Sequence, residues 1–211
     1  MLIALLVLLF TICVKAQELK FGLMTGLNNT TFRISNVSGN SFSSVTINSA
    51  ISYHINAVVE FRSDSWWGVT LEPGYIKKGG SLDLTYLKGS AIAYSQNSFE
   101  YANIQLPVLL NIYLGQKFYL STGLSFDYSI SSSDNNRYRA LFIPNYEILP
   151  VMNNKLFCSA QLGISYELTK KYDIGIRYEY GLTKLVDVNL IKGLTNSVYQ
   201  DCIQLSLKYN I

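Results

Sequence analysis

Hydrophobic and polar residues alternate with a period of two along residues 156–168 and again along residues 172–182. Successive side chains of a β-strand point to opposite faces, so each stretch predicts a strand with one apolar and one polar face. The connection between them, residues 169–171, is short and predicts a tight turn, and therefore an antiparallel hairpin. Strands of soluble proteins usually have about 5–6 residues, whereas a tilted strand that crosses a bilayer needs about 9–11. The length of this hairpin therefore indicates a membrane protein.

Six further stretches alternate in the same way, which brings the predicted strands to eight. They are residues 19–28, 51–61, 67–76, 103–114, 118–130 and 202–211. Short connections alternate with long ones rich in Ser and Asn; the short ones are residues 62–65, 115–117 and 169–171, and the long ones are 33–50, 79–97, 131–154 and 183–199. Outer-membrane barrels combine short periplasmic turns with long outside loops in this way. The pattern predicts an all-β fold, an eight-stranded antiparallel up-and-down transmembrane β-barrel.

The alternation does not by itself say which face points outward. A soluble lipocalin-like barrel, the alternative, would place the apolar set inside. The polar set here consists mostly of Gly, Ser, Asn and Gln, which suit the crowded interior of an eight-stranded barrel. The apolar set ends in aromatic residues, as membrane-interface girdles require: Phe61, Trp67, Phe118, Tyr128, Tyr172, Tyr180 and Tyr209. We therefore expect the apolar faces to contact lipid.

Two prolines, Pro73 and Pro107, lie inside predicted strands. Each removes one hydrogen bond from the ladder, and a closed barrel has no edge strand on which to place it. We therefore expect a β-bulge at both positions.

The first 16 residues predict a secretory signal peptide. Residues 2–14 are almost continuously apolar, and Ala16 supplies the small residue expected before cleavage at Gln17. A membrane-spanning anchor is the alternative, but about 13 apolar residues fall short of the roughly 20 that a helix needs. Residues 17–211 would then form a single barrel domain in the outer membrane of a Gram-negative bacterium.

Composition narrows the classes of function. Charged residues make up 15% of the chain against about 25% in ordinary soluble domains, and 16 of the residues are tyrosines. A net charge of +3 is too small to argue for a nucleic acid or an acidic substrate as partner. Cys158 and Cys202 lie at opposite parities of their strands, so we expect no disulfide between them. We expect no metal site and no cofactor.

Five segments carry a resemblance to a known family. They are FGLMTGLN at residues 21–28, LEPGY at 71–75, KGG at 78–80, IQLPVLL at 104–110 and RYEYGLT at 177–183. In this order and spacing the sequence resembles the PorT-like family of small outer-membrane β-barrels found in Bacteroidota. The resemblance implies the fold and the outer-membrane location. It also raises a role in an assembly that secretes proteins across the outer membrane.

His54 is the one candidate for catalysis. It shares the polar face of its strand with Ser52 and Glu60, and a serine, a histidine and an acid can form a hydrolase site. Small barrel enzymes that cut lipid work from their outer surface, whereas the parity of His54 places it in the lumen. A hydrogen-bonded lumenal histidine is the alternative, and we expect no enzyme and no catalytic residue.

Four charged residues fall on the inward parity near the middle of their strands: Glu72, Arg177, Glu179 and Lys208. They either line a pore or pair as a structural plug, in which pairing removes the cost of burying each charge alone. We expect the plug.

These observations predict a structural or interaction role through long outside loops rather than transport. Outer-membrane lipid is one expected partner, and a protein at the loops or in a secretion or gliding assembly is another. Residues 137–150 are unusually apolar for a loop, so they are expected to dock on the rim or bind a partner. A lipid-modifying enzyme and a soluble binder of apolar ligands remain alternatives.

Overall fold

The computed structural model describes residues 18–35, 42–88, 91–141, 151–152, 155–191 and 194–211. The predicted signal peptide, residues 1–16, lies outside the described residues, and so does the apolar loop segment 137–150 beyond residue 141. The strands are β1 (Glu18–Ser35), β2 (Phe42–Arg62), β3 (Trp67–Leu71), β4 (Gly74–Lys88), β5 (Ala91–Leu114), β6 (Phe118–Leu141), β7 (Val151–Met152), β8 (Leu156–Thr169), β9 (Tyr172–Gly181), β10 (Val186–Ile191) and β11 (Leu194–Asn210). None of these described residues forms a helix that is long and apolar enough to cross a membrane.

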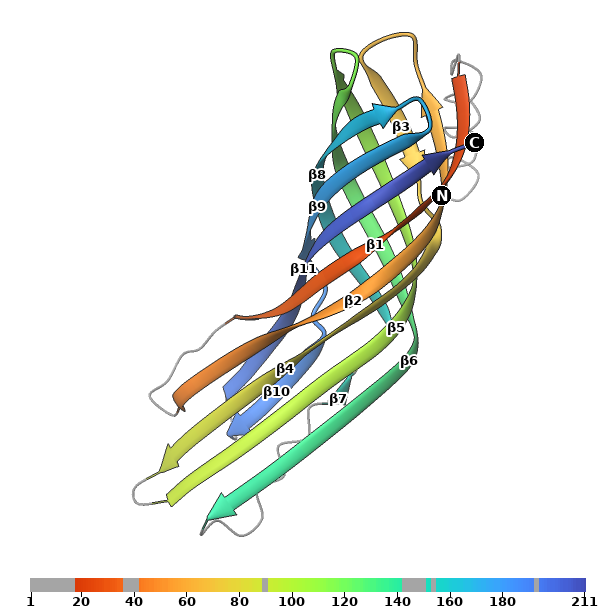
Figure 1. The fold of residues 1–211 in the computed structure, drawn as a ribbon. Helices are drawn as coiled ribbons and strands as arrows, with labels where there is room; N and C mark the ends of the chain where they lie inside the picture. Colours follow the sequence, from red (N-terminus) through yellow and green to blue (C-terminus); the bar gives the residue numbers. More distant parts are fainter. Residues whose placement is uncertain (1–17, 36–41, 89–90, 142–150, 153–154, 192–193) are drawn as a thin grey trace, which may run out of the picture.

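The strands close into an antiparallel ring (Figure 1). Its order is β1, β2, β3, β5, β6, β8, β9 and β11, and β11 pairs back with β1 from Gly22↔Asn210 to Ser35↔Ser197. β4 continues β3, because both lie between β2 and β5. The predicted eight-stranded antiparallel barrel is therefore confirmed.

The break between β3 and β4 arises from the two prolines. Both keep their carbonyl groups in the ladder, since Ala57 N–H donates to the Pro73 oxygen at 2.9 Å and Glu72 N–H to the Pro107 oxygen at 3.0 Å. The pairing register of β2 and β5 is the same on both sides of the break. The predicted bulges at Pro73 and Pro107 are therefore wrong. Each proline only lacks an N–H to return the bond, which interrupts one barrel strand without shifting it.

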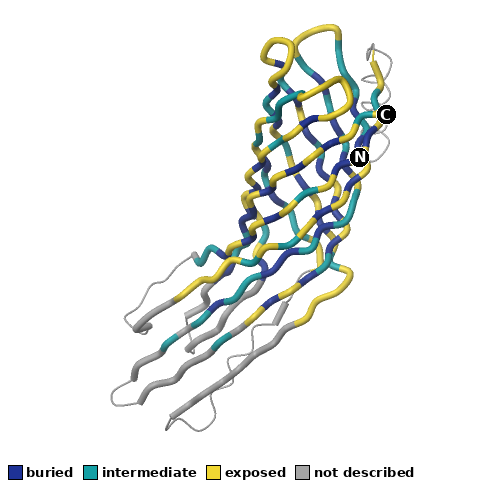
Figure 2. The backbone as a smooth tube through the Cα atoms, viewed as in Figure 1, coloured by how far each residue is buried: buried dark blue, intermediate teal, exposed yellow. Residues whose placement is uncertain are grey.

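The apolar faces point outward, as predicted. Figure 2 shows buried and exposed positions alternating along each barrel strand. The exposed positions include large hydrophobic residues from all around the ring, for example Leu23, Ile55, Leu106, Phe126, Leu162, Ile176 and Leu205. The buried positions are mainly polar or charged. This inversion of a soluble protein's pattern suits a barrel whose solvent is lipid.

Several strands are much longer than the alternation predicts. β5 has 24 residues and begins at Ala91, although alternation indicates a strand only from residue 103. Much of the predicted long loops 33–50, 79–97 and 131–154 is therefore strand. Figure 1 shows β2, β4, β5 and β6 continuing as one sheet beyond the barrel. The outward apolar set ends there, since polar Ser81 faces outward on β4, whereas the apolar side chain of Leu82 is buried on the inner face.

The opposite end of the barrel has the short turns. They join β2 to β3, β5 to β6 and β8 to β9, and both described ends of the chain lie near this end (Figure 1). Gly115, in the turn after β5, has a φ of 79°, a left-handed conformation that glycine adopts without steric cost. The predicted turns are therefore in place, and the two ends of the molecule differ as predicted.

Candidate functional site

The lumen is filled by polar side chains that the barrel strands point inward. Neighbouring positions on each strand alternate between lipid and lumen, so every second residue contributes to this interior. The charged members are Glu60, Glu72, Lys78, Asp127, Asp173, Arg177, Glu179 and Lys208. They form three ion-pair groups, which we call the lumenal network.

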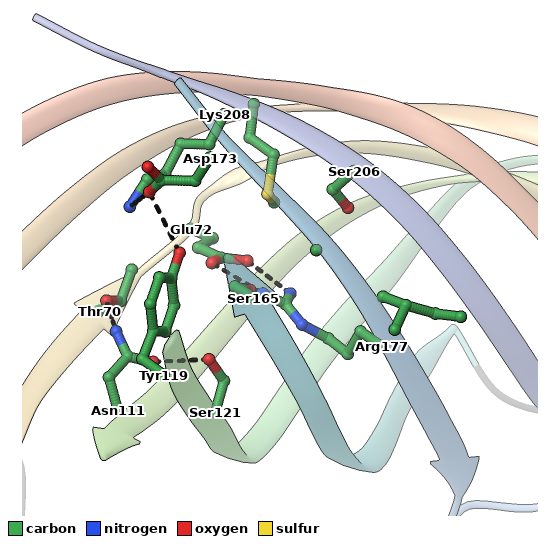
Figure 3. Close-up of a pocket in the computed structure, with 13 residues that line it drawn as sticks. Thr70, Glu72, Asn111, Tyr119, Ser121, Ser165, Asp173, Arg177, Ser206 and Lys208 are labelled. Carbon is green, nitrogen blue, oxygen red and sulfur yellow. Dashed lines mark hydrogen bonds and ion pairs between the residues drawn. The ribbon is translucent and has the colours of Figure 1, made fainter. Parts of the chain in front are cut away.

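The first group joins Arg177 of β9 to Glu72, the residue that follows β3. The guanidinium donates two parallel hydrogen bonds to the carboxylate, at 2.6 Å and 3.0 Å (Figure 3). It also donates to the side-chain oxygen of Gln161 at 3.3 Å. A bidentate contact of this kind fixes the relative orientation of the two side chains as well as their distance. It therefore links β9 to the β3–β4 break across the lumen.

The second group surrounds Lys208 of β11, near the end with the short turns. The ammonium contacts Glu60 at 2.9 Å and Asp173 at 2.7 Å. Each carboxylate receives a further hydrogen bond from a tyrosine hydroxyl, Tyr113 to Glu60 and Tyr119 to Asp173. One base therefore serves two acids, and the hydroxyl groups help to balance the surplus negative charge.

The third group surrounds Lys78 of β4, which is 2% exposed. Its ammonium contacts Asp127 at 2.7 Å and Glu179 at 2.5 Å. Glu179 also accepts hydrogen bonds from Ser159 at 2.8 Å and from Gln204 at 3.0 Å. These contacts bring together side chains from β4, β6, β8, β9 and β11, so the group crosses the lumen.

The structure thus separates the four residues singled out in the sequence. Glu72 and Arg177 pair with each other, whereas Glu179 pairs with Lys78, and Lys208 pairs with Glu60 and Asp173. Sequence reasoning missed Lys78 because it ended that strand at residue 76. The signal was present, since Lys78 lies two residues beyond Ile76, which points into the lumen and is fully buried.

His54 is held in the lumen without the partners of a hydrolase. Its Nδ1 lies 2.5 Å from Asn28 Oδ1, and its Nε2 lies 3.1 Å from Ser206 Oγ. The Ser52 hydroxyl donates to the backbone oxygen of Lys77. Because Glu60 is bound by Lys208 and Tyr113, the serine, histidine and acid do not form a chain.

Little free space remains beside the lumenal network. The cavity that Glu72, Arg177, Tyr119 and Lys208 help to line has a volume of about 20 Å³ (Figure 3). A cavity of this size holds about one water molecule. It is therefore no route for hydrated ions in this conformation.

An apolar cluster fills part of the interior toward the extended sheet. Its buried members are Phe32, Leu82, Phe99, Tyr101, Leu185 and Val198, and Ile34 and Phe157 pack against it. Phe32 and Phe99 meet edge to face with their ring centroids 5.7 Å apart. Polar groups thus fill the lumen within the membrane level, and an apolar core supports the strands where they leave it.

The comparisons with known proteins cover most of the chain. A family model described as outer membrane protein beta-barrel domain matches residues 15–187. A search of curated proteins found no significant match. Among solved structures, Ail, the attachment invasion locus protein of Yersinia pestis, is similar at 11% identity with a TM-score of 0.46, covering 92% of this chain and 100% of that one. OprG from Pseudomonas aeruginosa is similar at 10% identity with a TM-score of 0.40, covering 91% and 95%. The outer membrane protease OmpT from Escherichia coli is similar at 11% identity with a TM-score of 0.37, covering 93% and 97%.

Proposed function

Because the chain belongs to the family of outer membrane protein β-barrel domains, we propose that it is a closed barrel that presents a binding sheet outside the cell. The protein is a small integral protein of the outer membrane. Its barrel anchors β2, β4, β5 and β6, whose outer parts continue beyond the barrel (Figure 1). This extended sheet is the observation that carries the proposal, because a barrel needs no such strands merely to span a bilayer.

The extended sheet offers an open edge to a partner. β6 pairs with β8 only as far as Tyr128↔Leu156, and Ser129 N–H then donates to the oxygen of Lys155 at 2.8 Å. Beyond that point β6 continues to Leu141, with β5 on one side. Within the described ranges no strand pairs with its other side. Unpaired backbone groups of this kind accept an added strand from a binding partner, and we infer that a protein segment binds here.

A crosslinking experiment tests this edge. A photo-reactive amino acid at Ser132, an exposed position on the open part of β6, should give protein adducts on intact cells. The same amino acid at Thr122, which is exposed on the paired part of the same strand, should react with lipid only. The readout is the mass of the adducts after purification. Equal protein adducts at both positions, or none at Ser132, would remove the support for a binding edge.

We propose no catalytic activity for the lumen. His54, the candidate found in the sequence, is hydrogen-bonded to Asn28 and Ser206 rather than to a nucleophile. Its burial also keeps a substrate away from the ring.

A finer proposal is that the open edge of β6 belongs to a secretion or gliding assembly. It rests on the resemblance of residues 71–75, 104–110 and 177–183 to PorT-like barrels. Recovery of secretion components with the wild-type protein, and their loss when residues 131–133 are replaced by proline, would support it. Adducts with an unrelated surface protein would favour a general binding role instead.

A further inference from the structure

A hollow lies on the outer face of the sheet, at the level where the strands leave the membrane. Its volume is about 430 Å³, within the range of roughly 300–1,000 Å³ that is common for sites that bind small molecules. Outward-facing residues of β2, β4, β5 and β6 surround it, namely Ile51, Lys77, Ser81, Ser98, Glu100 and Ser133. Lys78 of the lumenal network contributes to the lining from the inner side, and the hollow reaches Ser133 on the open part of β6.

The backbone at the hollow is unusual. The pairing of β2 with β4 is interrupted between Ser49↔Gly80 and His54↔Ile76, where the register shifts. The oxygen of Lys77 instead accepts hydrogen bonds from the side chains of Asn28 and Ser52. The sheet therefore lacks regular β2–β4 pairing beside the hollow.

Gly79 forms the floor of the hollow. It faces outward between Lys77 and Ser81 and adds no side chain. A Cβ at this position would lie 2.8 Å from the oxygen of Phe99, which is closer than such atoms approach. The interrupted β2–β4 pairing and the absence of a side chain at Gly79 together create the concavity.

The residues around the hollow indicate where it lies relative to the membrane surface. Tyr53 and Tyr75 pack on the outer face with their ring centroids 6.0 Å apart, as in the aromatic girdle of a membrane interface. The next outward residue of β4 after Tyr75 is Lys77, and the next outward residue of β2 beyond Tyr53 is Ile51. The hollow therefore begins one outward position beyond the girdle, at the level of the lipid headgroups.

The chemistry of the lining selects among headgroup components. The Lys77 ammonium already contacts Glu100 at 2.7 Å, so these two residues give the hollow no net charge. A phosphate would meet the carboxylate of Glu100 as a repelling neighbour. Sugar hydroxyl groups match the lining better, because they donate to Glu100 and accept from Lys77. The hydroxyl groups of Ser81, Ser98 and Ser133 can do both.

We propose that this hollow binds the sugar headgroup of an outer-leaflet glycolipid. The apolar band below it holds the acyl chains of the same molecule, so one lipid satisfies both surfaces. Such a lipid would be held beside the base of the extended sheet and would brace its outer face.

Native mass spectrometry of the purified protein, titrated in detergent with short-chain lipopolysaccharide, tests the proposal. Ser98→Trp fills the hollow from an exposed position and should raise the dissociation constant at least about tenfold, the loss of a few hydrogen bonds. Thr122→Trp adds the same ring to the outer face of β6 away from the hollow and should leave the constant within about twofold. Unchanged heat-modifiable mobility on gels shows that both variants fold. Equal binding by Ser98→Trp and the wild type would overturn the proposal.

Two further probes separate the parts of the lipid. Lipopolysaccharide with its phosphates removed should bind as tightly as the intact lipid, and the delipidated core oligosaccharide should compete with it. Loss of binding on removal of phosphate would make the hollow an anion site instead. Failure of the oligosaccharide to compete would assign recognition to the acyl chains, and either result would contradict a sugar site.

Discussion

Replacing Lys78 by alanine is expected to lower the free energy of unfolding by about 3–5 kcal/mol, the cost of breaking a buried ion pair from one side. Lys78 is the only base that contacts Asp127 and Glu179 in the described lumenal network. Its loss would leave two carboxylates buried without a cation. The measurement is urea unfolding of the barrel in lipid vesicles, followed by the mobility of the folded band on gels.

The neighbouring lysine is a matched control. Lys77 points outward, and its contact with Glu100 is partly exposed. Exposed ion pairs contribute about 0–1 kcal/mol, so Lys77→Ala should unfold close to the wild type. A second control replaces the whole group, as Lys78→Met with Asp127→Asn and Glu179→Gln, and should recover most of the loss. Equal damage at the two lysines would contradict the assignment of Lys78 to the lumen.

Placing an arginine on the lipid face should have the next largest effect. Ile176 is exposed on the outer face of β9 between Ile164 and Leu205, well inside the apolar band. Arginine near the bilayer midplane costs about 2–4 kcal/mol, so Ile176→Arg should hinder stable insertion. The yield of folded, heat-modifiable protein in purified outer membranes measures it.

The same substitution at another depth provides the control. Ile51 is 77% exposed and lies one outward position beyond the Tyr53–Tyr75 pair. Near an interface the cost of arginine falls to about 0–1 kcal/mol, so Ile51→Arg should insert normally. Equal loss at both positions, or greater loss at Ile51, would mean that the membrane level is misplaced.

The part of the fold that crosses the membrane can be predicted from the sequence. Each residue there faces either lipid or the lumen, so apolar and polar residues alternate. The hairpin predicted at residues 156–168 and 172–182 matches β8 and β9 within one residue at each end. The extended strands escape the prediction because the outward apolar set ends where the strands leave the barrel, and the next apolar positions, Leu82, Leu84 and Tyr86, alternate at the opposite parity. Residues 79–97 are the clearest case: β4 and β5 pair there without interruption up to Lys88↔Ala91.

The lumenal network was only partly predictable for a different reason. Parity places Glu72, Arg177, Glu179 and Lys208 inside, but it does not say which charges face each other across the barrel. That depends on strand tilt and shear, which are properties of the closed ring. Lys78 lies two residues beyond the predicted end of its strand, so the sequence groups Glu179 with Arg177 and Lys208 instead of with Lys78.

The closed lumen is the central claim, and single-channel recording in planar bilayers tests it most directly. Eight strands leave room for side chains but not for a column of water, and ion pairs cross the lumen at two places, Lys78–Glu179 and Arg177–Glu72. Purified wild-type protein should therefore show no regular conductance steps at any applied voltage. Regular steps whose ion selectivity changes in Arg177→Ala would show that the lumenal network lines a pore, and would contradict the account.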